Sequence, residues 1–292
     1  MDSIELNAYA KINLGLDVLR KREDGYHEVK MVMQSIQLHD RLKMKKITED
    51  KIKLECGGAA LPLGPENLIY RAVQLIREEY SISGGVSVEL TKQIPIAAGL
   101  AGGSTDAAAA LRGMNQLFSL GISEDELSEH GVKIGADVPF CLLQGTALSE
   151  GIGERLTRLP ELLPIPILIA KPPISVSTKY VYEHLTLDEM TDHPKIETIL
   201  EGIRQQDIKK IASSLGNLLE NVTVKEYPII QKLKQRMMEL GAENALMSGS
   251  GPTVFGLFLE EETAKEAYRI IREEGMAEAV ALTSPVGAPA GV

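Results

Sequence analysis

The sequence contains few cysteines and no long apolar run. Among its 292 residues there are only two cysteines, Cys56 and Cys141, which is too few for a disulfide framework or a cysteine-based metal cluster. We expect both to be buried thiols in a reducing compartment. No apolar stretch approaches the ~20 residues that span a bilayer, and the acidic residues 1–5 lack the apolar centre of a secretory signal. These absences predict a soluble cytoplasmic protein that has no membrane partner.

Positive charge is also scarce. The chain has 31 lysines and arginines against 41 acidic residues, which gives a formal net charge of −10. A general nucleic-acid binder normally presents a basic face, so that class of protein is not expected. A nucleotide substrate remains compatible with this charge, because a few local lysines suffice to bind one. Length and an apolar content of 44% predict one large or two moderate domains with a substantial core.

The most informative stretch, residues 95–106, has the sequence PIAAGLAGGSTD. Three glycines, Gly99, Gly102 and Gly103, fall within five positions, and four alanines typical of a helix follow. A glycine-rich loop that opens a helix presents backbone N–H groups and the positive end of the helix dipole, which together favour phosphate. Ser104 is expected to cap this helix or to place its hydroxyl on a phosphate-bound metal. The alternative interpretation is a tight turn with a serine cap.

This loop differs from the two common nucleotide-binding loops. A Walker A loop needs a lysine directly after its last glycine, whereas Ser104 follows Gly103 here. The G-x-G-x-x-G spacing of a dinucleotide fold is missing as well. A strand expected over residues 85–92 and the helix after the loop favour a nucleotide loop of a third kind.

Residues 4–18 alternate between apolar residues at even positions and mostly polar residues at odd positions. A period of two over this length predicts extended strand. Lys11 and Asn13 then project from the face opposite the apolar one. On a solvent-exposed face the pair would serve solubility alone, which is the simpler interpretation. If this face lines a cleft instead, Lys11 is a fixed cation and Asn13 a fixed amide.

The remaining periodicity predicts a mixture of helices and strands. A cluster of three prolines between Pro160 and Pro166 is the best boundary signal, so we expect domains at 1–160 and 161–292. Strands are predicted at 29–38, 41–47, 51–56, 167–170, 254–259 and 277–283. Helices are predicted at 65–80, 106–118, 123–134, 195–204, 206–220, 228–240 and 261–274. The tail from residue 284 to 292 is expected to be loose.

Three further stretches contain candidate site residues. Tyr26 and His27 follow an Asp-Gly turn, where such a pair either decorates the surface or holds a base. Asp137 lies between a glycine and a proline in GADVPF, where it either caps a helix or serves as a rigidly held carboxylate. Residues 248–253, SGSGPT, form a second loop of small residues.

Together, the stretches around Lys11, residues 95–108 and residues 248–253 resemble the GHMP kinases, the family of galacto-, homoserine, mevalonate and phosphomevalonate kinases. In that family the first stretch lies at the active centre, the second holds the ATP phosphates, and the third closes the site. The resemblance implies an α+β fold of two domains. It implies an N-terminal domain like ribosomal protein S5, a ferredoxin-like C-terminal domain, and an active site in the cleft between them.

Five stretches, AKINL, DGYH, PIAAGLAGGS, GADVPF and SGSGPT, most resemble the GHMP kinases that act on 4-diphosphocytidyl-2-C-methyl-D-erythritol in the non-mevalonate route to isoprenoids. The implied activity is ATP-dependent phosphorylation of the tertiary 2-hydroxyl of this small molecule, with ATP and Mg²⁺ as cofactors, by a monomer or homodimer. The rival interpretations are another GHMP kinase, with a mevalonate-type or amino-alcohol substrate, and a GHMP-fold sensor without catalysis.

The resemblance also implies roles for individual residues. Asp137 is the catalytic carboxylate, and Lys11 is the cation that keeps it ionised. Five residues are implied to bind the substrate, with the cytosine held between aromatic rings: Asn13, Tyr26, His27, Thr178 and Tyr182. The implied contacts to ATP are Asn67, Lys92, Pro95, Ala97, Ala98, Gly99, Leu100, Ala101, Gly102, Gly103, Ser104, Thr105 and Asn115. The third glycine loop comprises Ser248, Gly249, Ser250 and Gly251. Ser104 is the one candidate metal ligand.

Overall fold

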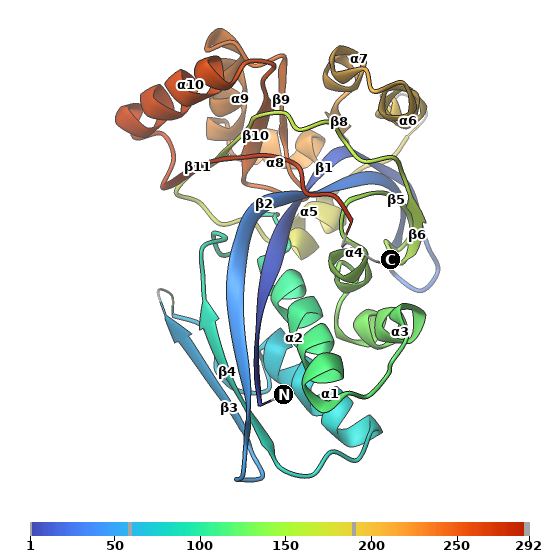
Figure 1. Ribbon diagram of the computed structural model, residues 1–292. Coiled ribbons are helices and arrows are strands. Elements are labelled where there is room, and N and C mark those ends of the chain that lie inside the picture. The colour runs from blue at the N-terminus through green and yellow to red at the C-terminus, as the bar shows by residue number, and fades with distance from the viewer. Residues whose placement is uncertain (1, 58–59, 189–190, 289–292) are drawn as a thin grey trace. The chain divides into compact units, whose positions relative to one another are not determined.

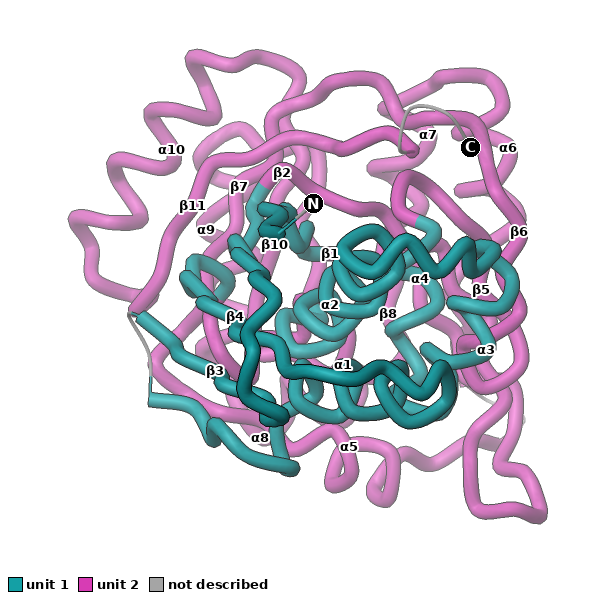
Figure 2. Tube along the Cα trace, turned by 60° about the horizontal axis from the view of Figure 1, so that its bottom comes forward, with its two compact units in different colours: residues 1–10, 38–94, 101–143 teal, residues 11–37, 95–100, 144–292 magenta. Residues whose placement is uncertain are grey.

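Two long strands at the start of the chain, β1 (Ser3–Lys21) and β2 (His27–Ile47), organise the fold. The computed structural model describes residues 2–57, 60–188 and 191–288. The chain forms two compact units, coloured separately in Figure 2. Unit 1 comprises Met1–Ala10, Leu38–Ile94 and Ala101–Leu143, and unit 2 comprises Lys11–Gln37, Pro95–Leu100 and Gln144–Val292. Both long strands therefore contribute residues to both units.

Strand β2 is continuous, so the break expected near Asp40 is wrong. Asp40 resembled a turn residue between two strands, but its side chain is fully buried. Its Oδ1 accepts hydrogen bonds from the backbone N–H groups of Gln93 (2.6 Å) and Ile94 (2.9 Å). Because neighbouring backbone satisfies the carboxylate, the strand continues through Asp40.

Unit 1 is a layer of helices on a sheet (Figure 1). The sheet has the order β3 (Ile52–Gly57), β4 (Gly85–Thr91), β2, β1. Helices α1 (Leu68–Glu79) and α2 (Gly102–Phe118) contact one another, and α3 (Glu124–Ile134) and α4 (Val138–Leu143) complete the layer. Apolar residues of strands and helices form one buried core, which includes Leu42, Met44, Leu54, Val86, Val88, Ile69, Val73, Ile76, Leu111 and Met114.

In unit 1, α1 and α3 begin at a residue whose side chain caps the helix, whereas α2 does not. Asn67 caps α1 by accepting a hydrogen bond from Ile69 N (2.8 Å), and Ser123 caps α3 by accepting one from Glu126 N. Helix α2 begins earlier than expected, after Ala101, whose φ of 57° turns the chain into the helix without a side-chain cap. Ser104 lies inside the first turn, so its predicted capping role is wrong.

Unit 2 contains a second, antiparallel sheet with the order β11 (Ala279–Thr283), β7 (Ile167–Lys171), β10 (Val254–Leu257), β9 (Asn244–Met247). Helix α9 (Ile229–Glu239) packs on β9 and β10, and α10 (Glu261–Glu274) packs on β7 and β11. This β-α-β-β-α-β order is ferredoxin-like, as predicted. The other elements of unit 2 are α5 (Thr178–His184), α6 (Ile196–Gln205), α7 (Ile208–Ser213), α8 (Glu220–Glu226), β5 (Thr146–Gly151), β6 (Arg155–Arg158) and β8 (Gly216–Asn217).

Two expectations for unit 2 are wrong. The single helix predicted over residues 206–220 is divided between α7, β8 and α8, because Gly216 and Asn217 pair in parallel with Gly15 and Leu16 of β1. The expected looseness of the tail fails over residues 284–288, where Val286 N donates to Ser35 O (2.8 Å). Residues 289–292 lie outside the described part of the chain.

Other expectations stand as follows. Cys141 is buried and Cys56 half-buried, and neither forms a disulfide. Across the described residues, no helix combines the length and apolarity needed to cross a membrane. Each compact unit is built from several separate stretches of the chain, so the units do not test a single domain boundary at residues 160–161. That boundary stays a prediction.

Candidate active site

Lys11 and Asn13 are buried in the middle of β1, with only 4% and 1% of their surfaces exposed. The Lys11 ammonium donates to Asn13 Oδ1 (2.8 Å) and to the Gly99 carbonyl oxygen (3.2 Å). The interpretation that this pair lies on a solvent-exposed face and serves solubility is therefore wrong. Both acceptors are neutral groups, so these two bonds leave the Lys11 ammonium without a paired carboxylate.

The loop Pro95–Leu100 of unit 2 is fitted closely around Gly99. Lys11 N donates to the Leu100 carbonyl (3.1 Å), which ties the loop to β1. The φ of Gly99 is +73°, and a Cβ at this position would lie only 2.2 Å from the Ser248 carbonyl oxygen. Only glycine fits this conformation and this space. The loop therefore lies directly against residues 248–251.

The third glycine loop, residues 248–251, is buried and lies against Gly99 and the Lys11 ammonium. Ser248 Oγ donates to the Gly99 carbonyl (3.0 Å). A Cβ on Gly249 would lie 3.1 Å from that carbonyl oxygen and 3.4 Å from Lys11 Nζ. The hydroxyls of Ser250 and Thr178 are 2.8 Å apart, which connects the loop to the first residue of α5.

An aromatic pair lies at the other end of α5. The rings of His27 and Tyr182 have their centroids 5.1 Å apart and are tilted by 36°. Burial, followed by the positive charge of Lys21, lowers the pKa of His27 below its ordinary value of 6.5, so the imidazole is neutral near pH 7. Tyr26 is 60% exposed at the hairpin tip, and the structure does not bring it into the ring pair.

The remaining predicted phosphate contacts lie at the start of α2, in unit 1. Gly103 is exposed and Ser104 half-buried, while Thr105 is buried and donates through Oγ1 to the Tyr9 carbonyl (2.8 Å). A Cβ on Gly102 would lie 3.2 Å from Lys92 Nζ. The first turn of α2 thus has a positive side chain beside its exposed backbone.

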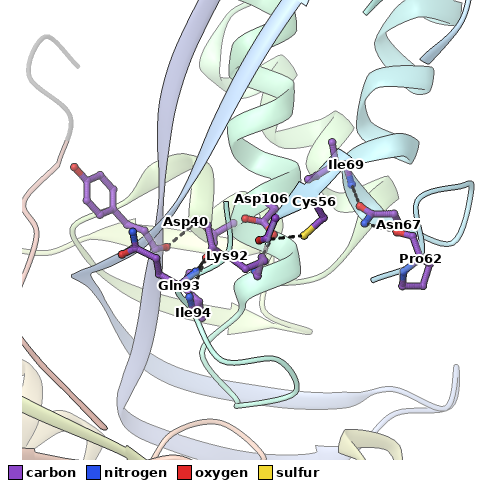
Figure 3. A network of polar contacts seen from close by, with 12 residues as sticks. Asp40, Cys56, Pro62, Asn67, Ile69, Lys92, Gln93, Ile94 and Asp106 are labelled. Atoms are coloured by element: carbon purple, nitrogen blue, oxygen red, sulfur yellow. Dashed lines mark hydrogen bonds and ion pairs between the residues drawn. The ribbon is translucent and has the colours of Figure 1, made fainter. Parts of the chain in front are cut away.

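Lys92 is the centre of a buried ionic cluster (Figure 3). Its ammonium pairs with Asp106 Oδ2 (2.9 Å) and, at shorter range, with Asp40 Oδ2. All three side chains are at least nine-tenths buried. Sequence reasoning gave Asp40 and Asp106 no role. Asp106 directly precedes four alanines, but Asp40 lies between His39 and Arg41. The pairing of both acids with Lys92 depends on the tertiary structure.

This cluster holds two carboxylates against one ammonium, which makes Asp106 hard to ionise. Burial, and to a lesser degree Asp40, raises the pKa of Asp106 from 3.8 to about 7, although Lys92 opposes the shift. Burial by itself lowers the pKa of Lys92, but Asp106 and Asp40 together raise it above its ordinary value. Asp106 Oδ1 is buried without a hydrogen-bond partner in the described structure.

We expect Asp106→Asn to remove a pH dependence of stability. Between pH 3.8 and about 7, folded Asp106 holds a proton that the unfolded chain has released, so stability falls as pH rises through this window. The variant should lose this slope and be more stable above pH 7 by about 1–4 kcal/mol. Urea unfolding of both proteins between pH 4.5 and 8 measures the difference. Parallel slopes in the two proteins would contradict it.

Asn67 and Asn115 have structural contacts in unit 1. Besides capping α1, Asn67 donates to the Pro62 carbonyl (2.8 Å). Asn115 Nδ2 donates to the Ile122 carbonyl (2.8 Å), and its Oδ1 accepts from Ile122 N (3.0 Å), so it fixes the connection between α2 and α3. Adenosine contacts by these residues and by Lys92 stay predictions.

Asp137 is the last residue before α4, and its side chain is half-buried. Its backbone carbonyl accepts the first helical hydrogen bond, from Cys141 N (3.0 Å). Within the described residues, its carboxylate has no hydrogen-bond or ion-pair partner. The carboxylate is therefore available to a ligand.

Comparison with known protein families now identifies the fold. The model of the GHMP kinase N-terminal domain matches residues 67–145, and the model of the GHMP kinase C-terminal domain matches residues 199–276. Together these matches cover more than half of the chain. The chain belongs to the GHMP kinase family. Membership confirms the predicted two-domain α+β fold and implies ATP as the phosphate donor.

Several known GHMP kinases are similar over nearly the whole chain. A 4-diphosphocytidyl-2-C-methyl-D-erythritol kinase from Lachnospira eligens is 52% identical over 97% of this chain and 98% of its own. A crystal structure of a 4-(cytidine 5'-diphospho)-2C-methyl-D-erythritol kinase has a TM-score of 0.83 and 35% identity, over 98% of this chain and 100% of that one. These relatives confirm the predicted resemblance and show that the chain is a kinase.

The fold extends to more distant members of the family. A homoserine kinase from Cytophaga hutchinsonii matches 99% of this chain and 96% of its own, with a TM-score of 0.81 but only 19% identity. At this identity the similarity shows the fold alone. Substrate choice within the GHMP kinases therefore depends on side chains placed on a shared backbone.

Proposed function

We propose that this GHMP kinase transfers the γ-phosphoryl group of ATP to the 2-hydroxyl of 4-diphosphocytidyl-2-C-methyl-D-erythritol, giving the 2-phosphate and ADP in the non-mevalonate isoprenoid route. The observation that carries the proposal is the contact between the rings of His27 and Tyr182. Both rings belong to unit 2, which also contains Lys11, the loop of residues 95–100 and the third glycine loop. The relatives named 4-diphosphocytidyl-2-C-methyl-D-erythritol kinase, which are about half identical over nearly the whole chain, support it. We expect a cytoplasmic monomer or homodimer that needs neither nucleic acid nor membrane.

The aromatic pair supports a cytidine-bearing substrate. Neutral His27 has one ring nitrogen that donates and one that accepts, which suits the mixed donor and acceptor edge of cytosine. Tyr182 offers a flat face for stacking. Tyr26, which is exposed and directly precedes His27 in the sequence, is a further candidate contact. A mevalonate-type or amino-alcohol substrate has no base and would leave this pair without a role.

The reaction itself requires mainly positioning and charge. The transition state of phosphoryl transfer is loose, so the protein chiefly aligns the groups and stabilises negative charge. We assign Asp137 to accept or orient the 2-hydroxyl proton, Lys11 to balance charge on the transferred phosphoryl group, and Asn13 to place the methylerythritol part. The backbone of residues 99–104 would bind the ATP phosphates.

The proposed reaction also uses Mg²⁺, and the side chains of the described residues limit how the protein could bind this ion. Within the described residues, no group of three or more His, Cys, Asp or Glu side chains forms a metal site. The half-buried hydroxyl of Ser104 is the candidate protein ligand, which suits an ion bound largely through substrate phosphates and water. When bound, Mg²⁺ supplies positive charge at the β- and γ-phosphates.

A coupled ADP-release assay tests the function. Mg·ATP would be offered with 4-diphosphocytidyl-2-C-methyl-D-erythritol, 2-C-methyl-D-erythritol 4-phosphate or mevalonate, with Asp137→Asn as the blank. We expect ADP release only with the cytidylated substrate. Release with mevalonate would overturn the substrate, and ATP binding without release for any acceptor would favour a sensor.

We expect Tyr182→Ala to weaken substrate binding selectively. Stacking a base on an aromatic ring is worth about 1–3 kcal/mol, so KM for the cytidylated substrate should rise by ~10–100-fold with little change in KM for ATP. Tyr180→Ala is the matched control, because Tyr180 lies on the same helix but stacks on His184 at 3.8 Å. Equal KM values for the two variants would place the cytosine elsewhere.

A further inference from the structure

A buried amide outside the predicted site has every hydrogen-bonding group satisfied. Asn217, in β8, is only 6% exposed. Its Nδ2 donates to the carbonyls of Met247 and Gly249, both at 2.8 Å, and its Oδ1 accepts from Leu219 N (3.0 Å). Two of these three bonds go to backbone carbonyls on either side of Ser248. One side chain therefore determines where the third glycine loop begins.

The short strand that carries Asn217 is fixed to the strand that carries Lys11. Asn217 pairs in parallel with Leu16 of β1, and Leu218 N donates to the Leu16 carbonyl (2.9 Å). Lys11 and Asn13 lie a few residues earlier on the same strand. Asn217 thus connects the third glycine loop to β1 through bonds that are all inside unit 2.

Helix α8, which follows Asn217, adds one bond to the residue before the loop and one to the loop itself. Glu220 Oε1 accepts from Met247 N (2.9 Å), and Thr223 Oγ1 donates to the Ser250 carbonyl (3.3 Å). On its other side, the loop donates from Ser248 Oγ to the Gly99 carbonyl, which also accepts from Lys11 Nζ. A shift of the loop would therefore move the acceptor that orients the Lys11 ammonium.

We infer that Asn217 is a positioning residue for phosphoryl transfer, which holds the Met247 and Gly249 carbonyls so that the third glycine loop fixes Gly99 and Lys11. The inference rests on the proposed function and adds a residue to it. Asn217 acts through the loop and through Lys11, so its loss should affect kcat more than substrate binding. A displacement of about 1 Å in such a site costs up to ~10²-fold in rate.

The test compares two asparagines with similar bonds. Asn217→Asp keeps the shape of the side chain but removes both N–H donors. Asn244→Asp is the matched control in the same unit, since Asn244 Nδ2 donates to the Ala212 carbonyl (2.7 Å) and Oδ1 accepts from Ala245 N (2.8 Å) at the opposite end of β9. For each variant, kcat, both KM values and the thermal unfolding midpoint are measured.

We expect Asn217→Asp to lower kcat by about 100-fold, with KM for the cytidylated substrate within about twofold of wild type. Asn244→Asp should lower the unfolding midpoint but keep kcat within about twofold. If Asn217→Asp lost stability alone, or if both variants lost kcat equally, the inference would be overturned. Wild-type protein that released no ADP with this substrate would overturn the proposed function and the inference with it.

A second variant covers the case in which Asn217→Asp does not fold. Thr223→Val has nearly the same shape and removes only the hydroxyl that donates to the Leu219 and Ser250 carbonyls. Because it loosens the same loop from the same side, we expect kcat to fall by about tenfold with KM values preserved. A Thr223→Val enzyme with wild-type kcat would overturn the inference.

Discussion

Replacing Asp137 by Asn should lower kcat by about 10²–10⁴-fold, the usual contribution of a general base. Asparagine preserves the shape of the side chain and its ability to accept a hydrogen bond, but it does not take up a proton. Asp137 directly precedes α4, and its carboxylate has no partner within the described residues, so no structural bond is lost by the substitution. The binding of ATP should remain close to that of wild type.

Single-turnover and steady-state kinetics, together with isothermal titration of ATP, measure this effect. Asp207→Asn is the matched control, because Asp207 also precedes a helix but its side chain accepts a hydrogen bond from Lys210 N (3.0 Å). The control should lose some stability and keep its kcat. An Asp137→Asn enzyme with kcat within about threefold of wild type would show that another group accepts the proton.

Gly99→Ala should damage both stability and catalysis. Alanine pays about 1–2 kcal/mol to adopt the left-handed conformation of Gly99, where φ is +73°. In addition, its methyl group would lie 2.2 Å from the Ser248 carbonyl oxygen, so either the loop of residues 95–100 or the third glycine loop must move. We expect a loss of more than ~2 kcal/mol in unfolding free energy and a fall of at least ~10²-fold in kcat/KM for ATP.

Gly275→Ala separates the steric effect from the conformational one. Gly275 ends α10 with a similar φ of +67°, but a Cβ there would meet no atom within 4 Å. This control should lose only about 1 kcal/mol and retain full activity. Denaturant unfolding and ATP-dependent kinetics of both variants measure the contrast. Equal losses of stability, with activity intact in both, would show that the loops adapt to the methyl group.

The sequence predicted best those features that depend on neighbours along the chain. Helix α10 was predicted over residues 261–274 and has these bounds, because its apolar spacing and its terminal glycine are local signals. The glycine-rich loop was predicted to open a helix for the same reason. The resemblance placed His27 and Tyr182 around one cytosine, with Tyr182 on its other face. The structure brings the two rings together, while their role in binding cytosine stays a prediction.

Features that depend on distant segments were missed. Alternation along β1 separates its two faces but does not reveal that Gly99 and the third glycine loop cover Lys11, so burial of this lysine was not predictable. The ionic contacts of Asp40 with Lys92 join residues far apart in sequence. Strand β8 has only two residues, too few for any periodicity, and its pairing with β1 is a tertiary contact that divides a predicted helix.

The route of the chain through the compact units limits how the gene can be divided. The chain passes from one unit to the other after residues 10, 37, 94, 100 and 143. A fragment that ended at residue 160 would contain the whole of unit 1, but it would also retain Lys11–Gln37, Pro95–Leu100 and residues 144–160 without the remainder of unit 2. The complementary fragment would lack Gly99, whose carbonyl accepts a hydrogen bond from Ser248 of the third glycine loop, and Lys11, which donates to the same carbonyl. Split versions of this kinase, or chimaeras that exchange its C-terminal half with another GHMP kinase, must therefore preserve the fit of β1 and residues 95–100 to the incoming half.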